Sequence, residues 1–500
     1  MNNEEILKKS IAEISDLLDK KEVSSVELTR LVLAEIKRKD PKIKAFITVC
    51  EIEALEQAKE ADRLFAKNKK RRSKIDGVPI SLKDNICTAG VKTTAASKML
   101  SDFVPAYDAT IAERLKNAGA VIVGKCNLDA WAHGSSTENS DFFTTKNPYD
   151  LTRVPGGSSG GSCAAVASNM GFASVGTDTG GSVRQPAGFC NVVGLKPTYG
   201  RVSRYGLVAM ASSLDQAGPI TKTAQDAGIL LEIMCGADPK DATTVPKMKF
   251  SAQAVSRQPS AISNLKIGLP KEYFGKGLDP EIKKIVLEKV EELKKQGAKI
   301  KEISLPNTDY ALAVYYIIQP AEVSSNLARY DGIRYGFSSN SEKLKAMPTG
   351  RQAKSVNDLY NANRAQGFGD EAKRRIMLGT YVLSSGYYDA YYKKAMKVRT
   401  LVCEDFNRAF KEVDVIITPT SPTVPFKIGE REQDPLSMYL ADIYTVGANI
   451  AGIPGVSVPA GFVNQQTTIN KQLTTKLPVG LQILGPMWSE ELILNIADKI

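Results

Sequence analysis

Apolar residues follow a helical period in several segments of the chain. Over residues 4–39 this period predicts two helices, and Ser24 followed by Glu27 forms a capping box where the second would begin. The same spacing predicts further helices over residues 51–66, 109–116, 312–327 and 371–383.

Short apolar runs rich in β-branched residues alternate with these helices. Each run has the length of a buried strand, and the runs cover residues 77–85, 120–125, 172–176, 266–269, 413–418, 456–459 and 479–484. Strands that alternate with helices predict an α/β fold with a large central sheet.

Two polar stretches interrupt this pattern. Residues 240–264 have no sustained period and indicate a linker-like excursion, whereas residues 330–370 are rich in Ser, Asn and Gly. The second stretch belongs to a helical region, at about residues 308–400, that could cover a site as a lid. We expect one domain over residues 1–500. It would begin with a helical region at residues 1–70 and a core at residues 77–235, followed by the excursion at residues 240–264 and the rest of the sheet at residues 265–500.

The composition is that of a soluble globular protein, with 43% hydrophobic and 24% charged residues. No run of about 18 apolar residues could span a membrane, and residues 1–9 lack the apolar run of a secretory signal. The 7 cysteines are scattered without a CxxC pair, which indicates neither disulfides nor a zinc site and fits the cytoplasm. We expect no metal site. The chain has 1 histidine, His133, so mechanisms that need several histidines are excluded.

The net charge of +11 and a pI of about 9.0 permit anionic partners such as nucleic acid. The basic tract at residues 67–74 begins with five charged residues among its first six. It is either a solvated loop or a surface that faces RNA, and the sequence leaves both interpretations open.

Two segments rich in glycine and serine, residues 154–162 and 178–182, suggest chemistry. Glycines let the backbone approach a ligand and point its N–H groups at an oxyanion or a phosphate. A P-loop does not fit, because Ser162 and Cys163 stand where a lysine and a Ser/Thr are needed. A hydrolase nucleophile elbow does not fit either, because its histidine must follow the serine and His133 precedes it.

A serine whose base is a lysine remains possible. A lysine can accept the hydroxyl proton if burial lowers its pKa enough to keep it neutral. Lys83 ends an apolar run and is the candidate base. The alternative is a lysine at a strand end that extends its amine to water.

The residues of three segments, 77–84, 156–162 and 177–187, resemble the three signature blocks of the amidase signature family, in order and at the family's spacing. The resemblance implies a large central mixed β-sheet covered by helices on both faces. It also implies a Ser-cisSer-Lys triad in which Ser182 is the nucleophile, Ser158 follows a cis peptide and relays the proton, and Lys83 is the base. The backbone N–H groups of Thr179, Gly180, Gly181 and Ser182 would then form the oxyanion hole. Ser159 and Ser162 would serve the turn and the start of a helix.

Five further segments are similar to the glutaminase subunits of tRNA-dependent amidotransferases, namely residues 134–140, 196–209, 212–216, 374–380 and 478–482. This resemblance implies an enzyme that releases ammonia from glutamine within a cytoplasmic heterotrimer. A partner B subunit would use ATP and Mg to activate an aminoacyl-tRNA, either Glu-tRNA(Gln) or Asp-tRNA(Asn), and a small C subunit would wrap the pair. This chain itself would need no cofactor.

The same resemblance implies how glutamine is held. Arg375 would bind the α-carboxylate and Asp442 the α-ammonium, with Tyr316 nearby. Arg374 competes with Arg375 for its role, and Tyr315 with Tyr316, while solvated helix positions are the alternative for the charged pair.

One segment departs from the family pattern. His133 ends a stretch, residues 128–133, in which these subunits commonly have Met-Asp-Glu-Phe-Ala-Met. We expect it to line the pocket or the core rather than to act as a catalyst. The rival hypotheses are a free-standing amidase for a small or aryl amide and, from a different class, a basic RNA-binding or scaffold subunit with an inactive site.

Overall fold

One mixed sheet organises the protein, as seen in a computed structural model that describes residues 2–245, 250–255, 262–339, 355–431, 434–466 and 474–500. Eleven strands follow the order β1-β3-β2-β4-β6-β5-β10-β11-β9-β7-β8. Their bounds are β1 Phe46–Val49, β2 Pro79–Lys83, β3 Val121–Cys126, β4 Ala173–Asp178, β5 Val193–Lys196, β6 Gln216–Thr221, β7 Lys266–Pro270, β8 Lys299–Ile303, β9 Val415–Pro419, β10 Gly455–Gln466 and β11 Thr474–Leu484.

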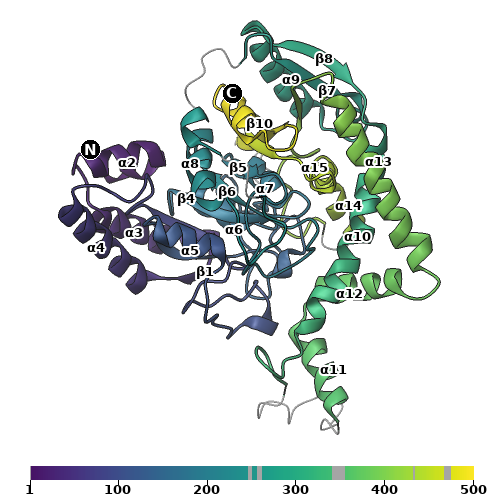
Figure 1. The fold of residues 1–500 in the computed structure, drawn as a ribbon, viewed down its shortest axis with the longest axis horizontal. Helices are drawn as coiled ribbons and strands as arrows, with labels where there is room; N and C mark the ends of the chain where they lie inside the picture. Colours follow the sequence, from purple (N-terminus) through teal and green to yellow (C-terminus); the bar gives the residue numbers. More distant parts are fainter. Residues whose placement is uncertain (1, 246–249, 256–261, 340–354, 432–433, 467–473) are drawn as a thin grey trace.

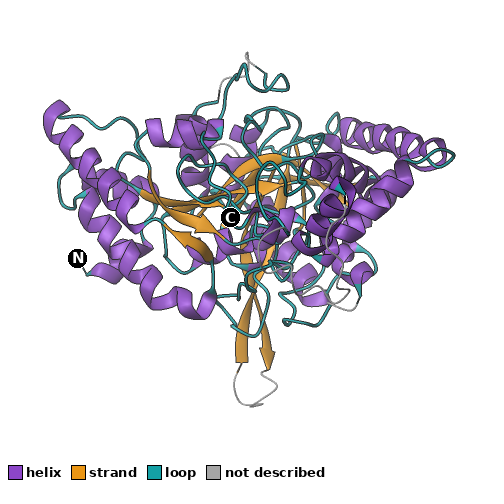
Figure 2. Ribbon diagram, turned by 90° about the horizontal axis from the view of Figure 1, so that it is seen from below, coloured by secondary structure: helices purple, strands orange, loops and turns teal. Residues whose placement is uncertain are grey.

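The sheet has a parallel group near each side and an antiparallel middle, and the edge strand β1 pairs antiparallel with β3. β2 runs parallel to β3 and β4, and β7 runs parallel to β8 and β9, whereas β4, β6, β5, β10, β11 and β9 pair antiparallel in turn. Helices lie on both sides of the sheet (Figure 2), and the ends of β10 and β11 project from the body. The predicted α/β fold with a mixed sheet is confirmed.

All seven predicted strands are present, but four others were not predicted. β1, β5, β6 and β8 lack a long apolar run for different reasons. β6 contains glycine and proline within QAGPIT, and β8 is an edge strand with the sequence KIKEI, mostly facing solvent. Tertiary pairing overrides weak local preference at such positions.

The helices surround the sheet along the whole chain (Figure 1). They are α1 Asn3–Lys8, α2 Ile11–Asp19, α3 Ser25–Ile43, α4 Glu51–Asn68, α5 Thr110–Asn117, α6 Gly160–Ala167, α7 Arg184–Phe189, α8 Ala224–Met234, α9 Pro280–Lys295, α10 Ala311–Asn326, α11 Val356–Gly367, α12 Asp370–Leu383, α13 Lys394–Ala409, α14 Pro435–Tyr439, α15 Val446–Ala451 and α16 Glu490–Ala497. The stretch at residues 4–39, predicted as two helices, forms three, α1, α2 and α3, because a capping box of Ser10 with Glu13 starts a separate α2. The predicted box at Ser24 and Glu27 starts α3.

A hydrophobic core extends from Leu7 in α1 to Ala497 in α16. Part of the predicted excursion at residues 240–264 packs onto it, since Ala252–Val255 forms a short 3-10 helix against α8 and α16. Residues 246–249 and 256–261 of that stretch lie outside the described residues. Within the described ranges, no helix combines the length and the apolar character that crossing a bilayer requires.

The predicted lid region contains α10, α11, α12 and α13, on the right and lower sides of Figure 1. α10 packs against α12 and α13, and α11 extends away from the body. Gly379 allows the close approach of α12, because a Cβ there would collide with the carbonyl of Pro320 in α10. Residues 340–354 of the predicted lid lie outside the described residues.

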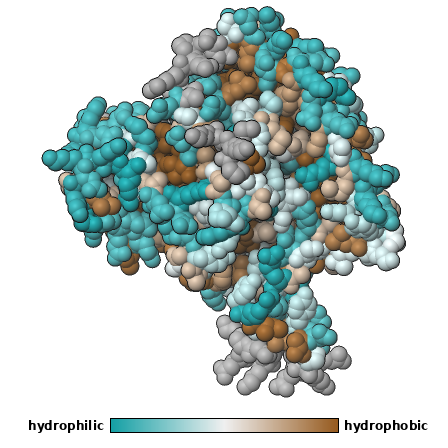
Figure 3. Space-filling view, viewed as in Figure 1, coloured by the Kyte–Doolittle hydropathy of each residue, from teal (hydrophilic) through white to brown (hydrophobic). Residues whose placement is uncertain are grey.

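The basic tract divides into solvated and structural parts. Lys67, Lys69 and Lys70 are exposed. The N-terminal region, on the left of Figure 3, has a largely hydrophilic surface. Arg71 is buried at its guanidinium, which donates to Asp19 Oδ1 at 2.9 Å and to the carbonyls of Ser15 and Asp76, each at 3.0 Å. Arg72 also pairs with Asp76. Both arginines of the tract thus bind carboxylates of the folded body and differ in this from the exposed Lys67, Lys69 and Lys70.

We expect Arg71→Ala to lower the free energy of unfolding by about 2–4 kcal/mol, because it leaves buried carbonyls without their charged donor. Urea denaturation followed by circular dichroism measures this change. Lys70→Ala, at an exposed position, is the control and should change the value by less than about 0.5 kcal/mol. Equal effects of the two substitutions would contradict the structural role of Arg71.

Candidate active site

The parallel pairing of β2 with β4 brings the predicted base to the signature segments. Lys83 is the last residue of β2, and its carboxyl end lies beside that of β4. Its Nζ lies 2.7 Å from Ser158 Oγ, 3.0 Å from Thr177 Oγ1 and 3.3 Å from the Thr177 carbonyl. A hydrogen bond thus links Lys83 directly to Ser158, although the two residues come from separate segments of the sequence.

Burial makes Lys83 a base. The side chain is 0% exposed, and this desolvation lowers the pKa of Lys83 from 10.5 to about 7, although Asp129, Asp178 and Asp215 act in the opposite direction. A large fraction of the amine is therefore neutral near pH 7 and can accept a proton.

Ser158 sits in a turn with little freedom. The peptide bond between Gly157 and Ser158 is cis, as the family resemblance implies. A Cβ at Gly157 would collide with Asp129 Oδ2, and the Gly157 N–H donates to Gln185 Oε1 at 3.0 Å. The requirement for glycine at this position is therefore steric.

The loop that carries Ser182 lies against the same turn. The N–H of Ser159, which precedes α6, donates to the carbonyl of Ser182 at 3.1 Å. Ser182 is 8% exposed, whereas Lys83 and Ser158 are fully buried. This difference suits a nucleophile that must meet a substrate and a base that must stay dry.

A buried carboxylate shapes the Ser182 loop. Asp178 accepts the N–H groups of Gly181 at 2.9 Å and Val183 at 3.1 Å, and it pairs with Arg184 at 3.0 Å. Burial opposes ionisation, but Arg184 holds the pKa of Asp178 below its ordinary value. The sequence analysis missed Asp178 as a functional residue, although its place at the start of the Asp-Thr-Gly-Gly-Ser segment could have indicated it.

The predicted oxyanion donors differ in their surroundings. Gly181 already donates to Asp178, while the Thr179 hydroxyl donates to Asp215 Oδ1 at 2.7 Å. Gly180 lies against Tyr315, since a Cβ on this glycine would come within 2.7 Å of that ring. The assignment of the oxyanion donors stays a prediction, and Thr179, Gly180 and Ser182 are the predicted donors whose backbone N–H groups Asp178 does not accept.

Arg375 lies at a cavity of about 80 Å³ that Tyr316 also lines. The Arg375 side chain is 3% exposed. Its Nε donates to Glu371 Oε1 at 2.8 Å and its Nη1 to Gln319 Oε1 at 2.7 Å. Its guanidinium carbon lies 5.2 Å from the centre of the Tyr316 ring and 5.4 Å from that of Tyr439. Neither contact was predicted from the sequence. Glu371 precedes Arg375 by four residues on α12, a spacing that the sequence itself displays, whereas Gln319 reaches Arg375 only through the packing of α10 against α12.

Asp442 reaches this cavity through a neighbour. Ser135 lines the cavity and donates its hydroxyl to Asp442 Oδ2 at 2.6 Å. Burial raises the pKa of Asp442 to about 7, and the positive charge of Arg375 moderates this rise. A cation that binds beside Asp442 would favour the ionised carboxylate.

The structure distinguishes the two pairs of neighbours that the sequence left open. Both arginines line the cavity and pair with Glu371, but Arg374 is half exposed whereas Arg375 is buried. Tyr316 lines the cavity, while Tyr315 packs against Gly180 of the nucleophile loop. These positions favour Arg375 and Tyr316 for the predicted contacts with substrate.

His133 is fully buried beside this pocket, as expected for a residue of the pocket or the core. Burial lowers the pKa of His133 well below 6.5, and the nearby Arg375 acts in the same direction. The imidazole is therefore neutral.

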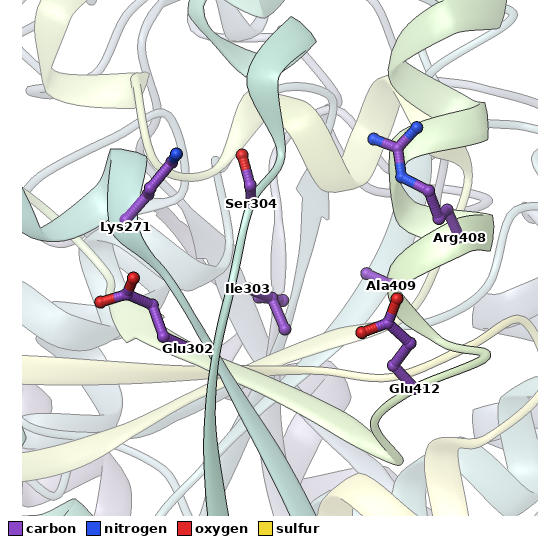
Figure 4. A pocket seen from close by; sticks show the side chains of 7 residues that line it. All are labelled: Lys271, Glu302, Ile303, Ser304, Arg408, Ala409 and Glu412. Atoms are coloured by element: carbon purple, nitrogen blue, oxygen red, sulfur yellow. The ribbon is translucent and has the colours of Figure 1, made fainter.

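A larger cavity, of about 240 Å³, lies away from these residues (Figure 4). Charged side chains surround it, including Lys271, Glu302, Arg408 and Glu412. Arg408 is paired with Asp405, and Glu412 with Lys301. This surface cavity brings together none of the predicted site residues.

Comparisons with known proteins show the family. The Amidase family model matches residues 27–494. The A subunit of glutamyl-tRNA(Gln) amidotransferase from Sulfurihydrogenibium sp. (strain YO3AOP1) is 52% identical over 497 residues, which are 99% of this chain and 97% of that protein. The crystal structure of the protein of the same name from Thermotoga maritima is similar with a TM-score of 0.78 and 44% identity, over 98% of this chain and 94% of that chain. The native peptide amidase of Stenotrophomonas maltophilia gives a TM-score of 0.77 and 29% identity, over 98% and 96% of the two chains. The chain belongs to the amidase family.

Proposed function

We propose that this chain is the glutaminase subunit of a glutamyl-tRNA(Gln) amidotransferase. The observation that carries the proposal is the buried pair of opposite charges, Arg375 and Asp442, beside the hydrogen-bonded Lys83 and Ser158. Arg375 lines the small cavity and Asp442 lies behind Ser135, which also lines it, and this placement of a cation and an anion suits an amino acid, which carries both charges. A neutral amide would need neither.

The chemistry follows from the positions of Lys83, Ser158 and Ser182. Ser182 Oγ attacks the side-chain carbonyl of glutamine, and its proton passes through the Ser158 hydroxyl to the neutral Lys83 amine. The C–N bond then breaks, the proton returns to the leaving nitrogen, and ammonia departs from a glutamyl ester of Ser182. A water molecule hydrolyses this ester to glutamate and free Ser182, with Lys83 again as the base.

The partners of the proposal come from the relatives. Their name, which marks them as one subunit of a glutamyl-tRNA(Gln) amidotransferase, implies an assembly of several subunits. We infer a B subunit that uses ATP and Mg and a small C subunit. The ammonia would convert Glu-tRNA(Gln), or Asp-tRNA(Asn), to the amidated form. The 7 cysteines are free thiols, which supports a reducing cytoplasm.

A free-standing amidase is the alternative, and the likeness to a peptide amidase keeps it testable. Ammonia release from glutamine is measured for the chain alone and for the chain with the subunits that co-purify from its native host. The proposal expects weak release alone and strong stimulation by the partners and aminoacyl-tRNA. High activity on aryl amides without partners, and no preference for glutamine, would support the alternative.

Arg375→Lys should raise KM for glutamine about 10–100-fold with little change in kcat, because a lysine cannot form a bidentate contact with a carboxylate. Steady-state kinetics of ammonia release measures both constants. Arg374→Lys is the matched control on the neighbouring residue of α12 and should leave KM within about twofold. A larger effect at Arg374 would transfer the α-carboxylate contact to that residue.

A further inference from the structure

His133 lies in the sequence between residues that line two cavities. The residue before it, Ala132, lines a narrow cavity together with Thr177 and Thr179. The residue after it, Gly134, lines the cavity of Arg375. Arg375 is also close enough to lower the pKa of His133, so His133 belongs to the surroundings of Arg375.

The imidazole of His133 has nothing to bond to in the described part of the chain. Its backbone is held at both ends, since the N–H donates to the Ala130 carbonyl at 3.0 Å and the carbonyl accepts from Asn139 Nδ2 at 2.9 Å. Both ring nitrogens, however, are buried without a hydrogen-bond partner among the described residues. Buried polar atoms of this kind are rare in folded proteins and call for a ligand or water.

The segment around His133 is held in an unfavourable backbone conformation. Trp131 and Ala132 are consecutive residues with φ of 60° and 64°, in the left-handed region that residues with a Cβ avoid. Asp129 holds the segment by accepting the Thr137 N–H at 2.9 Å, and the Trp131 ring packs on Tyr330 with centres 4.6 Å apart. Backbone strain that the surroundings maintain is concentrated at functional sites.

Gln319 leaves a second polar group unpaired beside Arg375. This α10 side chain is 0% exposed, and its Oε1 accepts from Arg375 Nη1 at 2.7 Å. A guanidinium can only donate, so the oxygen of the amide must face Arg375 and the NH2 must face away. Among the described residues, this Nε2 has no acceptor.

We propose that His133 and Gln319 donate hydrogen bonds to the α-carboxylate of bound glutamine and complete the anion site that Arg375 begins. This inference rests on the proposed function, since it names the contacts of the same substrate. A neutral imidazole provides one N–H donor and the Gln319 amide provides two, while Glu371 already uses Nε of Arg375. An anion with four lone-pair positions can satisfy donors from all three side chains, whereas Arg375 alone is partly neutralised by Glu371.

The consequence is discrimination for amides that carry an α-carboxylate. In the complex purified from the native host, His133→Leu and Gln319→Leu should each raise KM for glutamine about 10–100-fold, as expected for the loss of a hydrogen bond to a charged group, with kcat nearly unchanged. The comparison substrate is 4-aminobutanamide, which has the amide and the ammonium but no carboxylate. Its kcat/KM should stay within about twofold in both variants, because the lost donors have no partner on it.

Three controls decide between substrate contact and structure. Thr29→Val removes a buried hydroxyl on α3 that, like the polar groups of His133 and Gln319, has no partner among the described residues. It should change neither kcat nor KM for glutamine. His133→Gln keeps a side-chain N–H and should recover part of the glutamine KM that His133→Leu loses. Thermal unfolding of each variant shows whether the fold is intact.

Two results would overturn the inference. An unchanged KM for glutamine would mean that the two groups do not touch substrate, and an equal loss on both substrates would mean that they act on the amide or on packing. Wild-type enzyme that releases no ammonia from glutamine would instead refute the proposed function, so the two failures are distinguishable.

Discussion

Ser182→Ala should lower kcat for ammonia release from glutamine by about 10⁴–10⁶-fold, while the protein still folds and assembles with its partners. The reason is that no acyl-enzyme can form without the hydroxyl, and removal of a serine nucleophile in other hydrolases has effects of about this size. The substitution removes one oxygen from a side chain that holds none of the loop in place. Asp178 and Arg184 continue to hold it.

Two measurements make this expectation specific. Hydroxylamine should trap the glutamyl ester of the wild-type enzyme as a hydroxamate and yield none from Ser182→Ala. Ser162→Ala is the matched control, because Ser162 lies in α6 within the same glycine-serine segment and should stay within about twofold of wild type. Turnover retained in Ser182→Ala would refute the nucleophile assignment.

Lys83→Met should lower kcat/KM by about 10²–10⁴-fold, because Ser158 would have no base to receive the proton. Methionine fills a similar volume without an amine, so we expect the variant to fold. A mild loss would show that another group serves as base.

The pH dependence of the wild-type enzyme tests the same role. Protonated Lys83 cannot accept a proton, so kcat/KM should fall as pH falls through about 7 and level off above it. Asp442, with a pKa of about 7, must be ionised to hold the α-ammonium and acts in the same direction. The logarithm of kcat/KM should therefore fall with a slope approaching 2 below pH 7, and with a slope near 1 in Asp442→Asn.

Stability provides an independent measure of the buried amine. Unfolded Lys83 binds a proton up to about pH 10.5, whereas folded Lys83 releases it at about 7. The unfolded state thus binds more protons between these values, so Lys83 makes the free energy of unfolding rise with pH across this window. Lys83→Met should lack this contribution to the slope, and an unchanged slope would contradict the lowered pKa.

Local pattern was sufficient for seven of the eleven strands and for the family, but it left helices such as α8 and α9 unpredicted. Capping boxes, helical periods and apolar runs depend on neighbours in the chain, and they predicted seven strands correctly. They failed at β6, where glycine and proline hide a strand, and at Ser10 with Glu13, where a second box divides the first helix. Pairing between distant strands decides the case of β6, and no local signal reports it, whereas the box of Ser10 with Glu13 is a local signal that the prediction did not use.

The catalytic segments could be recognised because glycine and serine at fixed spacing are a local requirement of the backbone. The sequence by itself determined Lys83, Ser158 and Ser182 as candidates, but the lowered pKa of Lys83 comes from complete burial against Thr177. The parallel register of β2 and β4 produces that burial.

Substrate contacts depended most on tertiary structure. Arg375 could be named by resemblance, but its burial, its bond to Gln319 and its distinction from Arg374 follow from the packing of α12 on α10. In the sequence, His133 is only a departure from the family pattern. The structure adds that both of its ring nitrogens are buried without a hydrogen-bond partner among the described residues. The sequence thus determined the class of fold and the candidate reacting groups, whereas burial and the approach of distant helices decided the charge state of Lys83 and the surroundings of Arg375.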